Sequence, residues 1–345
     1  MSLSTKKREM IKHYILEQID SGNNDFVKKA VEAYEITSTS VYRYIKEMVN
    51  TGLIVKKGHS YSLISEDKIL LYDTDSIKDE MDILKKDLEP IYVDCPDNIV
   101  RIWRYCLSEM INNVLDHSES NRFTIICQKT YMSTMFLIAD DGVGIFKKIK
   151  EFYHMSSLDD AISELFKGKL TTDKVNHSGE GIFFSSNAVD FFAAISDGKV
   201  FSRNRYEDVN IDTLKSELSG NRNVSEIMSK GTIIVMKLSN HSSKTMKEVF
   251  DRFSDIENGF YKTIIPIKNI FDDYPVSRSQ AKRLVRRCEN FREVVLDFSE
   301  VDDLGQGFAH ELFVVFGKAH PNIKLVPMNA NEQVVKMIAH VRNTV

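Results

Sequence analysis

The segment IWRYCLSEMINNVLDHSES carries polar side chains that could take part in chemistry. At helical spacing, one face presents Glu109, Asn112, Asn113 and Asp116. An Asn amide oxygen, together with triphosphate oxygens and water, could coordinate Mg²⁺, because this ion prefers oxygen ligands. The carboxylate of Glu109, one turn before Asn113, could act as a general base. Alone, such a polar face is more often the solvated surface of an ordinary helix.

A predicted apolar strand, TMFLIA, leads directly into Asp140, Gly142 and Gly144. A carboxylate at the end of a strand can accept a hydrogen bond from an exocyclic amine. Glycines two residues apart let the backbone approach a flat base closely, because they carry no side chain. The pattern therefore favours adenine over a generic phosphate group.

Two later segments complete the pattern. In HSGEGIFFSSNAVDFF, Gly179 and Gly181 open a predicted helix, and its free N–H groups and dipole would suit phosphate oxygens. In KGTIIVMKL, a predicted strand begins with Gly231 and Thr232. A glycine at a helix start is a weak indication by itself, so the interpretation depends on the four segments together.

In order, the motifs E-x-x-x-N-x-x-x-H, D-x-G-x-G, G-x-G and G-T resemble the nucleotide-binding boxes of the GHKL ATPase superfamily. That family includes histidine kinases, gyrase, mismatch-repair and heat-shock ATPases, and anti-sigma-factor kinases. The resemblance implies a two-layer α/β sandwich over residues 95–245 that binds ATP and Mg²⁺. It places Asn113 on the metal, Asp140 on the adenine amine and Glu109 as the candidate catalytic base. The nucleotide-binding candidates are Asn112, Asn113, Asp116, His117, Asp140, Gly142, Gly144, Ile145, Lys174, Gly179, Glu180, Gly181 and Thr232.

The resemblance also implies a mobile lid between the second and third motifs, in FKGKLTTDKVNHSGEG. In this lid Lys169, Lys174 or His177 could reach the terminal phosphate.

Two features depart from the family pattern. Glu180 lies between the glycines of the third motif and Phe183–Phe184 follow them, where family members commonly have small or aliphatic residues. Residues 66–94 contain no histidine, so the phosphoacceptor helix of a sensor histidine kinase is missing. We therefore do not expect autophosphorylation of the two-component kind.

Residues 1–65 predict a winged helix-turn-helix. After two helical segments, a Ser/Thr cluster caps a helix with Val41 and Ile45 on one side, and Gly52 ends it before a short pair of strands. In this fold the helix would read the DNA major groove and the wing would lie near phosphates. The DNA-binding candidates are Ser38, Ser40, Tyr42, Arg43, Lys46, Lys56, Lys57 and His59.

The charge distribution agrees with an anionic partner for this segment. Residues 1–64 hold ten Lys and Arg against seven Asp and Glu, a net +3, which leaves −7 for the rest of a chain whose total is −4. The alternative is a protein-contact or dimerisation module, because the reading helix carries only two basic residues.

Residues 66–94 are charged and polar, and SIKDEMDILKKDLEP predicts a short amphipathic helix that ends at Pro90. We expect a helical connector here, which could pair with another copy in a homodimer.

Residues 246–345 alternate predicted helices and strands, which indicates a small α/β domain. The stretch EVVLDFSEVDDLGQGFAHELFVVF resembles the anti-sigma-factor antagonist (STAS) domain, and more closely a STAS-like domain attached to such ATPases in bacteria. In the antagonist family a Ser or Thr at the start of this helix is phosphorylated. Residues 303–307 here contain no hydroxyl, so we do not expect that regulation.

Two features of this domain have an ordinary structural interpretation. Gly305 and Gly307 suit a tight strand-to-helix turn with a closely packed helix, and Arg283, Arg286 and Arg287 suit a solvated helix face. The domain then acts as a contact module for the ATPase and not as an enzyme.

The composition, 42% hydrophobic and 28% charged, is that of a folded protein. No apolar run approaches the roughly 18 residues of a membrane span, and the start MSLSTKKREM lacks a signal-peptide core. The four cysteines are widely spaced, which indicates neither a zinc site nor a disulfide framework. We expect a cytoplasmic multidomain α+β protein: a winged helix, an α/β-sandwich ATPase domain and a small STAS-like domain.

These predictions leave three functions open. The first is a bacterial, DNA-binding transcription regulator in which Mg-ATP binding or slow hydrolysis switches contacts among the three domains. The second is an anti-sigma-type serine/threonine kinase that acts on a partner protein. In the third, ATP is structural or is hydrolysed for mechanical work. Phosphate release without labelled protein would favour the first or third, and transfer to a partner would favour the kinase.

Overall fold

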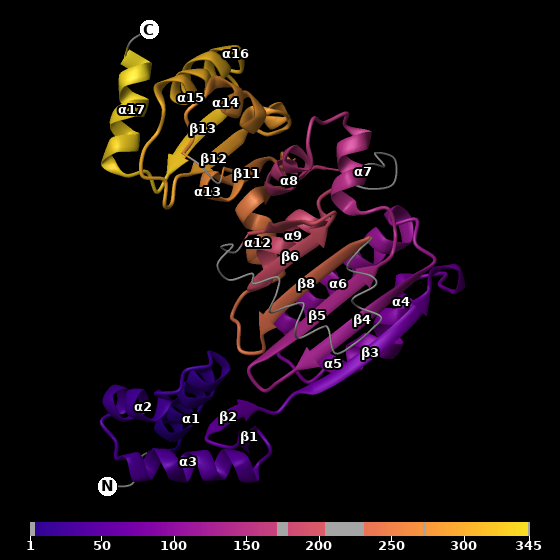
Figure 1. Ribbon diagram of the computed structural model, residues 1–345, viewed down its shortest axis with the longest axis vertical. Helices are drawn as coiled ribbons and strands as arrows, with labels where there is room; N and C mark the ends of the chain where they lie inside the picture. Colours follow the sequence, from indigo (N-terminus) through magenta and orange to yellow (C-terminus); the bar gives the residue numbers. More distant parts are fainter. Residues whose placement is uncertain (1–3, 171–178, 204–230, 272–273, 344–345) are drawn as a thin grey trace. The chain divides into compact units, whose positions relative to one another are not determined.

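The computed structural model describes residues 4–170, 179–203, 231–271 and 274–343 of a mixed α/β, multidomain chain (Figure 1). The chain divides into two compact units. The first consists of residues 1–70, 126–136 and 237–242, and the second of residues 71–125, 137–236 and 243–345. No helix among the described residues is both long and apolar enough to cross a membrane.

The N-terminal part of the first unit consists of helices followed by a hairpin: α1 (Thr5–Asp20), α2 (Phe26–Tyr34), α3 (Ser38–Asn50), β1 (Ile54–Lys57) and β2 (Ser60–Leu63). Thr37 caps α3, because its side chain accepts a hydrogen bond from the backbone N–H of Ser40. Val41 and Ile45 recur at helical spacing and are buried in the core that these elements share. The antiparallel hairpin turns at Gly58, whose φ is 62°. The helices and the strand pair predicted for residues 1–65 are therefore present.

A sheet with the strand order β3-β4-β5-β8-β6-β7 follows in the chain. Its strands are β3 (Glu66–Asp73), β4 (Arg122–Lys129), β5 (Ser133–Asp140), β6 (Phe191–Ser196), β7 (Lys199–Ser202) and β8 (Thr232–Ser239). The neighbouring strands β5 and β8 are buried along most of their lengths. The end of β5 meets the start of β8, since the N–H of Thr232 donates to Oδ1 of Asp140 at 3.3 Å.

The segment expected to be a helical connector begins differently. Residues 66–73 are the edge strand β3, and Tyr72 stacks on Phe123 of β4 with ring centroids 5.1 Å apart. The strand begins with the charged residues Glu66, Asp67 and Lys68. Because of them, the composition of the segment indicates a polar connector, although Ile69–Leu71 are apolar. A short 3-10 helix (Thr74–Ser76) follows β3, and then come α4 (Glu80–Ile83), a π-helical turn (Leu84–Leu88) and α5 (Glu89–Tyr92).

The helices of the middle region are α6 (Asp97–His117), α7 (Ile145–Phe152), α8 (Leu158–Lys167), α9 (Gly181–Ala188) and α12 (Met246–Phe253). Helix α6 buries residues at helical spacing, including Ile99, Trp103 and Met110, and it packs against α9 and α12. Its partly buried polar face is consequently left for the pocket described below.

The C-terminal part contains a parallel sheet with the order β11-β12-β13. Its elements are β11 (Lys262–Pro266), α13 (Ile267–Ile270), α14 (Arg278–Val285), β12 (Glu293–Asp297), α15 (Gln306–His310), a π-helical turn (Glu311–Phe316), α16 (Gly317–Ala319), β13 (Lys324–Met328) and α17 (Glu332–Asn343). Short strands β9 (Ser254–Asp255) and β10 (Gly259–Phe260) precede them. Helices connect parallel strands here, as the alternating pattern predicts.

The glycine turn before α15 is closely packed. A Cβ on Gly305 would lie 2.5 Å from Cα of Val276, and the N–H of Gly305 donates to the carbonyl of Pro275 at 2.9 Å. This agrees with the interpretation of Gly305 as a residue that permits close packing. All four cysteines are free thiols. Cys106, Cys127 and Cys288 are buried, and Cys95 is partly buried.

Candidate nucleotide-binding site

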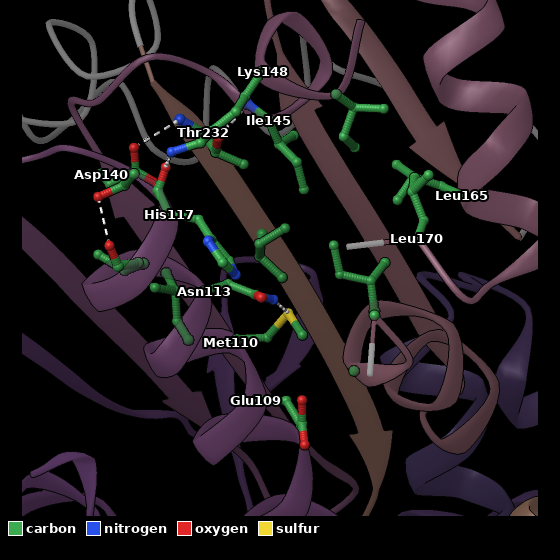
Figure 2. Close-up of a pocket in the computed structure, with 18 of the residues that line it drawn as sticks. Glu109, Met110, Asn113, His117, Asp140, Ile145, Lys148, Leu165, Leu170 and Thr232 are labelled. Atoms are coloured by element: carbon green, nitrogen blue, oxygen red, sulfur yellow. Dashed lines mark hydrogen bonds between the residues drawn. The ribbon is translucent and has the colours of Figure 1, made fainter. Parts of the chain in front are cut away.

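A pocket of about 260 Å³ lies in the second unit and is lined by parts of α6, β5, α7, α8, α9 and β8 (Figure 2). Its volume is close to the lower end of the range of small-molecule sites. The lining contains the candidate base Glu109 and most of the nucleotide-binding candidates, namely Asn113, His117, Asp140, Gly144, Ile145, Gly179, Glu180, Gly181 and Thr232. The four sequence motifs therefore converge on one cavity.

Asp140 is a buried carboxylate at one end of this pocket. The residue is 4% exposed, and its Oδ1 accepts hydrogen bonds from the N–H groups of Gly142 at 2.9 Å and Thr232 at 3.3 Å. Burial raises the pKa of Asp140 to about 6, although these hydrogen bonds act in the opposite direction. Within the described parts of the chain, Oδ2 accepts no hydrogen bond. That oxygen is available to a ligand's amine.

Two glycines allow the backbone to close around Asp140. A Cβ on Gly142 would overlap the carbonyl oxygen of Ser118, and a Cβ on Gly231, whose φ is 78°, would overlap the carbonyl oxygen of Asp140. Both positions therefore require glycine. Gly142 is not among the lining residues, and it acts on the pocket through its N–H to Asp140.

Helix α6 presents Glu109, Asn113 and His117 to the pocket, each one turn after the last (Figure 2). The predicted site residues Asn112 and Asp116 do not line it, and Asp116 is exposed. Each precedes a pocket residue by one position, which rotates a helical side chain by about 100°. The polar face predicted from the sequence is therefore wider than the one that the structure turns to the cavity: of its four residues, Glu109 and Asn113 line the pocket.

The N-terminus of α9 lies beside Glu109. A Cβ on Gly181 would overlap Oε2 of Glu109, so the carboxylate lies directly against this helix start. Gly179, whose φ is 68°, accepts a hydrogen bond from the N–H of Leu170 at 3.0 Å. The carboxylate of Glu109 and a glycine-led helix start thus occupy the end of the pocket away from Asp140.

Phe183 and Phe184 depart from the family pattern for a packing reason. Both are 1% exposed, and their rings lie 4.7 Å and 5.0 Å from the ring of Phe260 in β10. The rings of Phe250 and Phe253 in α12 complete this aromatic cluster. The bulky residues after the third motif therefore join α9 to the segment that leads into the C-terminal part.

Lys148 lines the pocket but was not predicted. It follows Gly144 by four residues on α7, and its Nζ donates to the carbonyl of His117 at 2.6 Å and to Glu119 at 3.0 Å. The helical spacing from Gly144 is the sequence signal that could have identified it. Lys148 provides a positive charge beside the C-terminus of α6.

Three residues were expected to reach a terminal phosphate: Lys169, Lys174 and His177. Lys174 and His177 lie outside the described residues. The Nζ of Lys169 donates to the carbonyl of Asn290 at 2.9 Å and lies 4.9 Å from the ring of Phe291. Lys169 does not line the pocket in this structure, because the C-terminal part holds its ammonium group.

Apolar side chains form the remaining walls: Met110, Val114, Ile138, Val143, Ile149, Leu165, Leu170, Ile182, Phe183 and Ile234. Leu165 and Leu170 lie across the pocket from Met110 and Asn113 (Figure 2). Sequence reasoning did not single out these residues, because an apolar residue in a helix or strand is usually core. Apolar walls beside a buried acceptor fit a flat heteroaromatic ring that carries an amine.

The DNA-binding candidates lie on the first unit. Ser38, Tyr42, Arg43 and Lys46 are exposed on α3, and Lys56, Lys57 and His59 are exposed on the hairpin. Ser40 differs, because it is partly buried and its hydroxyl lies 3.1 Å from the hydroxyl of Thr37 at the start of α3. Ser40 therefore supports the helix cap.

Comparison with known proteins supports the assignment of the C-terminal part. Residues 280–335 match the model of a STAS-like domain of unknown function (DUF4325). The matched segment runs from α14 through β13 into α17. The expected STAS-like domain is therefore confirmed. No curated protein matches the chain.

Proposed function

We propose that this protein is an ATP-dependent regulator that binds Mg-ATP in the pocket beside Asp140. The observation that carries the proposal is the buried carboxylate of Asp140, whose Oδ1 is held by two backbone N–H groups while Oδ2 is left for an amine. The apolar walls fit the adenine ring, and the convergence of the four GHKL-like motifs supports the choice of ATP.

The opposite end of the pocket fits the phosphates. Asn113 would supply an amide oxygen for a magnesium ion. A bound magnesium ion would neutralise charge on the phosphate oxygens. Glu109, placed against Gly181, would orient and deprotonate the attacking water.

The first unit is proposed to bind duplex DNA as a winged helix. Tyr42, Arg43 and Lys46 are exposed on one helix, as a major-groove reader requires, and Lys56 and Lys57 are exposed on the hairpin. The net charge of +3 on residues 1–64 agrees with a phosphate-rich partner. ATP then acts as a switch ligand if the conformations that it links bind it with different affinity.

The first experiment measures Mg-ATP binding and phosphate release for the native protein, Glu109→Gln and the control Glu119→Gln. Glu119 is a carboxylate near the pocket that pairs with Lys148 but does not line the cavity. We expect slow turnover in the native protein, and turnover reduced about 100-fold with binding retained in Glu109→Gln. Unchanged turnover in Glu109→Gln would remove the proposed base.

The same labelled nucleotide separates the regulator from an anti-sigma-type kinase. Label that appears as free phosphate supports the regulator. Label that appears on a candidate antagonist protein supports the kinase, with Glu109 as base toward a protein hydroxyl.

The DNA-binding part is tested with Arg43→Ala/Lys46→Ala against Lys28→Ala/Lys29→Ala, which removes the same charge from exposed positions of α2. We expect the α3 variant to bind duplex DNA at least tenfold more weakly, as about 1–3 kcal/mol per base contact predicts, and the α2 variant to bind nearly as the native protein does. A native protein that binds no duplex at low salt would exclude the winged-helix proposal.

A further inference from the structure

Residues 164–170 are shared between the pocket and the STAS-like domain. Leu165, Gly168 and Leu170 line the pocket. Glu164, Lys167 and Lys169 contact residues of the C-terminal part, as the distances below show. One short segment therefore forms a pocket wall on one side and a domain contact on the other.

The contact begins with an ion pair that is almost fully buried. The side chain of Lys167 is 1% exposed, and its Nζ donates to Glu164 at 2.6 Å and to the carbonyl of Arg286 at 2.6 Å. The hydroxyl of Thr263 in β11 donates to the carbonyl of Lys167 at 2.9 Å. The end of α8 is thus fastened to β11 and to the C-terminus of α14.

Arg287 forms the centre of this contact. Its Nε lies 3.5 Å from Glu164, its Nη2 donates to the carbonyl of Lys169 at 2.6 Å, and its guanidinium lies 4.4 Å from the ring centroid of Tyr153. Its side chain is 18% exposed, whereas Arg283 and Arg286 of the same region are 48% and 40% exposed. The expectation of a solvated basic face therefore fails for Arg287.

The backbone at both ends of the Arg287–Lys169 hydrogen bond is in an uncommon conformation. Lys169 has a φ of 53° and Arg287 a φ of 62°, in the left-handed region that residues with a side chain seldom adopt. Such conformations persist where surrounding contacts fix them. The neighbouring Gly168, with a φ of 83°, packs against the ring of Phe260.

The fixed segment continues directly into the pocket. The N–H of Leu170 donates to the carbonyl of Gly179 at 3.0 Å, and Gly179 to Gly181 lead into α9 beside Glu109. Arg287 is therefore connected to the end of the pocket that fits the phosphates through Lys169, Leu170 and Gly179.

We propose that Arg287 of the STAS-like domain is a positioning residue for the nucleotide pocket. By holding the carbonyl of Lys169, it sets the position of the wall formed by Gly168 and Leu170, and hence of the glycines that open α9. A partner that displaces the STAS-like domain would change the affinity for the triphosphate without touching the nucleotide. This inference rests on the proposed function.

The test compares the full-length native protein, Arg287→Gln and the control Arg283→Gln, which removes an equal charge from a more exposed group that lies 3.7 Å from Asp160. Calorimetry measures the affinity for Mg-ATP and for adenosine, and hydrogen exchange measures the Leu170 amide without nucleotide. We expect Arg287→Gln to bind Mg-ATP about tenfold more weakly, with adenosine affinity nearly unchanged. We also expect exchange of the Leu170 amide to be about tenfold faster, and the control to behave as the native protein.

Loss of Arg287 leaves the buried Glu164 with fewer partners, so the single variant could fail to fold. The conservative variant Arg287→Lys keeps a positive charge beside Glu164 but lacks the forked guanidinium that reaches both Glu164 and the carbonyl of Lys169, and it should show the same weakening.

The outcomes separate this inference from the proposed function. A native protein that binds Mg-ATP, with Arg287→Gln unchanged in affinity and in Leu170 exchange, overturns the positioning role alone. A native protein that binds no ATP overturns the proposed function, and the Leu170 exchange then decides whether Arg287 positions the wall. Equal weakening for ATP and adenosine indicates general destabilisation and counts against the positioning role.

Discussion

The two ends of the pocket are held in place in different ways. At one end, Asp140 is fixed by backbone N–H groups of Gly142 and Thr232, which belong to the same β5–β8 framework. At the other end, the wall at Gly168–Leu170 depends on side chains from the STAS-like domain, above all Arg287. The end proposed for adenine is therefore held by residues of the sheet region, whereas the end proposed for the phosphates contacts a second domain.

This difference suggests a division of tasks. In the proposed function, the Asp140 end would recognise the base, and its two backbone hydrogen bonds come from residues outside the STAS-like domain. A phosphate end that shares residues 164–170 with that domain can respond to it. The following predictions test the two ends separately.

The largest effect on stability is expected at the Asp140 end of the pocket. Gly231→Ala should lower the free energy of unfolding by about 4 kcal/mol, because its φ of 78° disfavours a side chain and the new Cβ would overlap the carbonyl oxygen of Asp140. Urea unfolding of the variant measures this change. The control Gly198→Ala has a similar φ of 71° but no atom within 4 Å of the new Cβ, and should cost only about 1 kcal/mol. Equal costs for both variants would show that the start of β8 is not tightly packed.

A slightly smaller effect on stability is expected where α8 contacts the C-terminal part. Lys167→Met should lower the free energy of unfolding by about 3 kcal/mol, because it leaves the carboxylate of Glu164 buried without its nearest cation. The same unfolding experiment on Lys247→Met provides the control, since Lys247 pairs with Asp251 on an exposed helix face and its loss should change stability little. If both variants unfold at the same urea concentration, the α8 contact does not fasten the two parts.

The third prediction is that the affinity for adenosine depends on pH through Asp140. The two N–H groups on Oδ1 direct a proton to Oδ2, where it would block acceptance from the adenine amine. Because the pKa of Asp140 is about 6, only about a tenth of the Asp140 carboxyl groups are ionised at pH 5. Adenosine affinity should therefore fall about tenfold from pH 8 to pH 5, as measured by calorimetry. Arg287→Gln should show the same pH profile, and a changed profile would break the separation of the two ends.

The stability of the nucleotide-free protein should depend on pH in the opposite direction. Burial raises the pKa of Asp140 above its unfolded value of 3.8, so between about pH 4 and pH 6 the folded state binds more protons than the unfolded state. The contribution of Asp140 to stability consequently decreases as the pH rises through this interval, and it stays lost above pH 6. The difference in unfolding free energy between native protein and Asp140→Asn isolates it.

The sequence was sufficient to predict the pocket residues that are recognised by their chemical type and their spacing. Asp140 follows an apolar strand, and Asn113 and His117 repeat the row of Glu109 at four-residue intervals, so local geometry alone brought them to one surface. Asn112 was assigned to the same row because helical spacing by itself does not fix the width of the face that turns inward.

The sequence could not reveal the features that depend on distant contacts. Nothing near Lys169 indicates that its ammonium group binds the carbonyl of Asn290, which lies 121 residues later. Arg287 resembles its neighbour Arg286 in sequence, and only packing against Glu164 and Lys169 distinguishes the two. The edge strand β3 was missed for a related reason, since its β pairing depends on β4.

The most direct test of the central claim is the affinity of Asp140→Asn for Mg-ATP, compared with the native protein and with Asp141→Asn. Asp141 is the neighbouring carboxylate, but it pairs with Arg122 at 3.2 Å and does not line the pocket. We predict that Asp140→Asn binds about 100-fold more weakly, because a hydrogen bond to a charged group contributes about 1.5–3 kcal/mol, and that Asp141→Asn binds as the native protein does. Equal affinities for all three proteins, or no binding by the native protein, would contradict the assignment of this pocket to ATP.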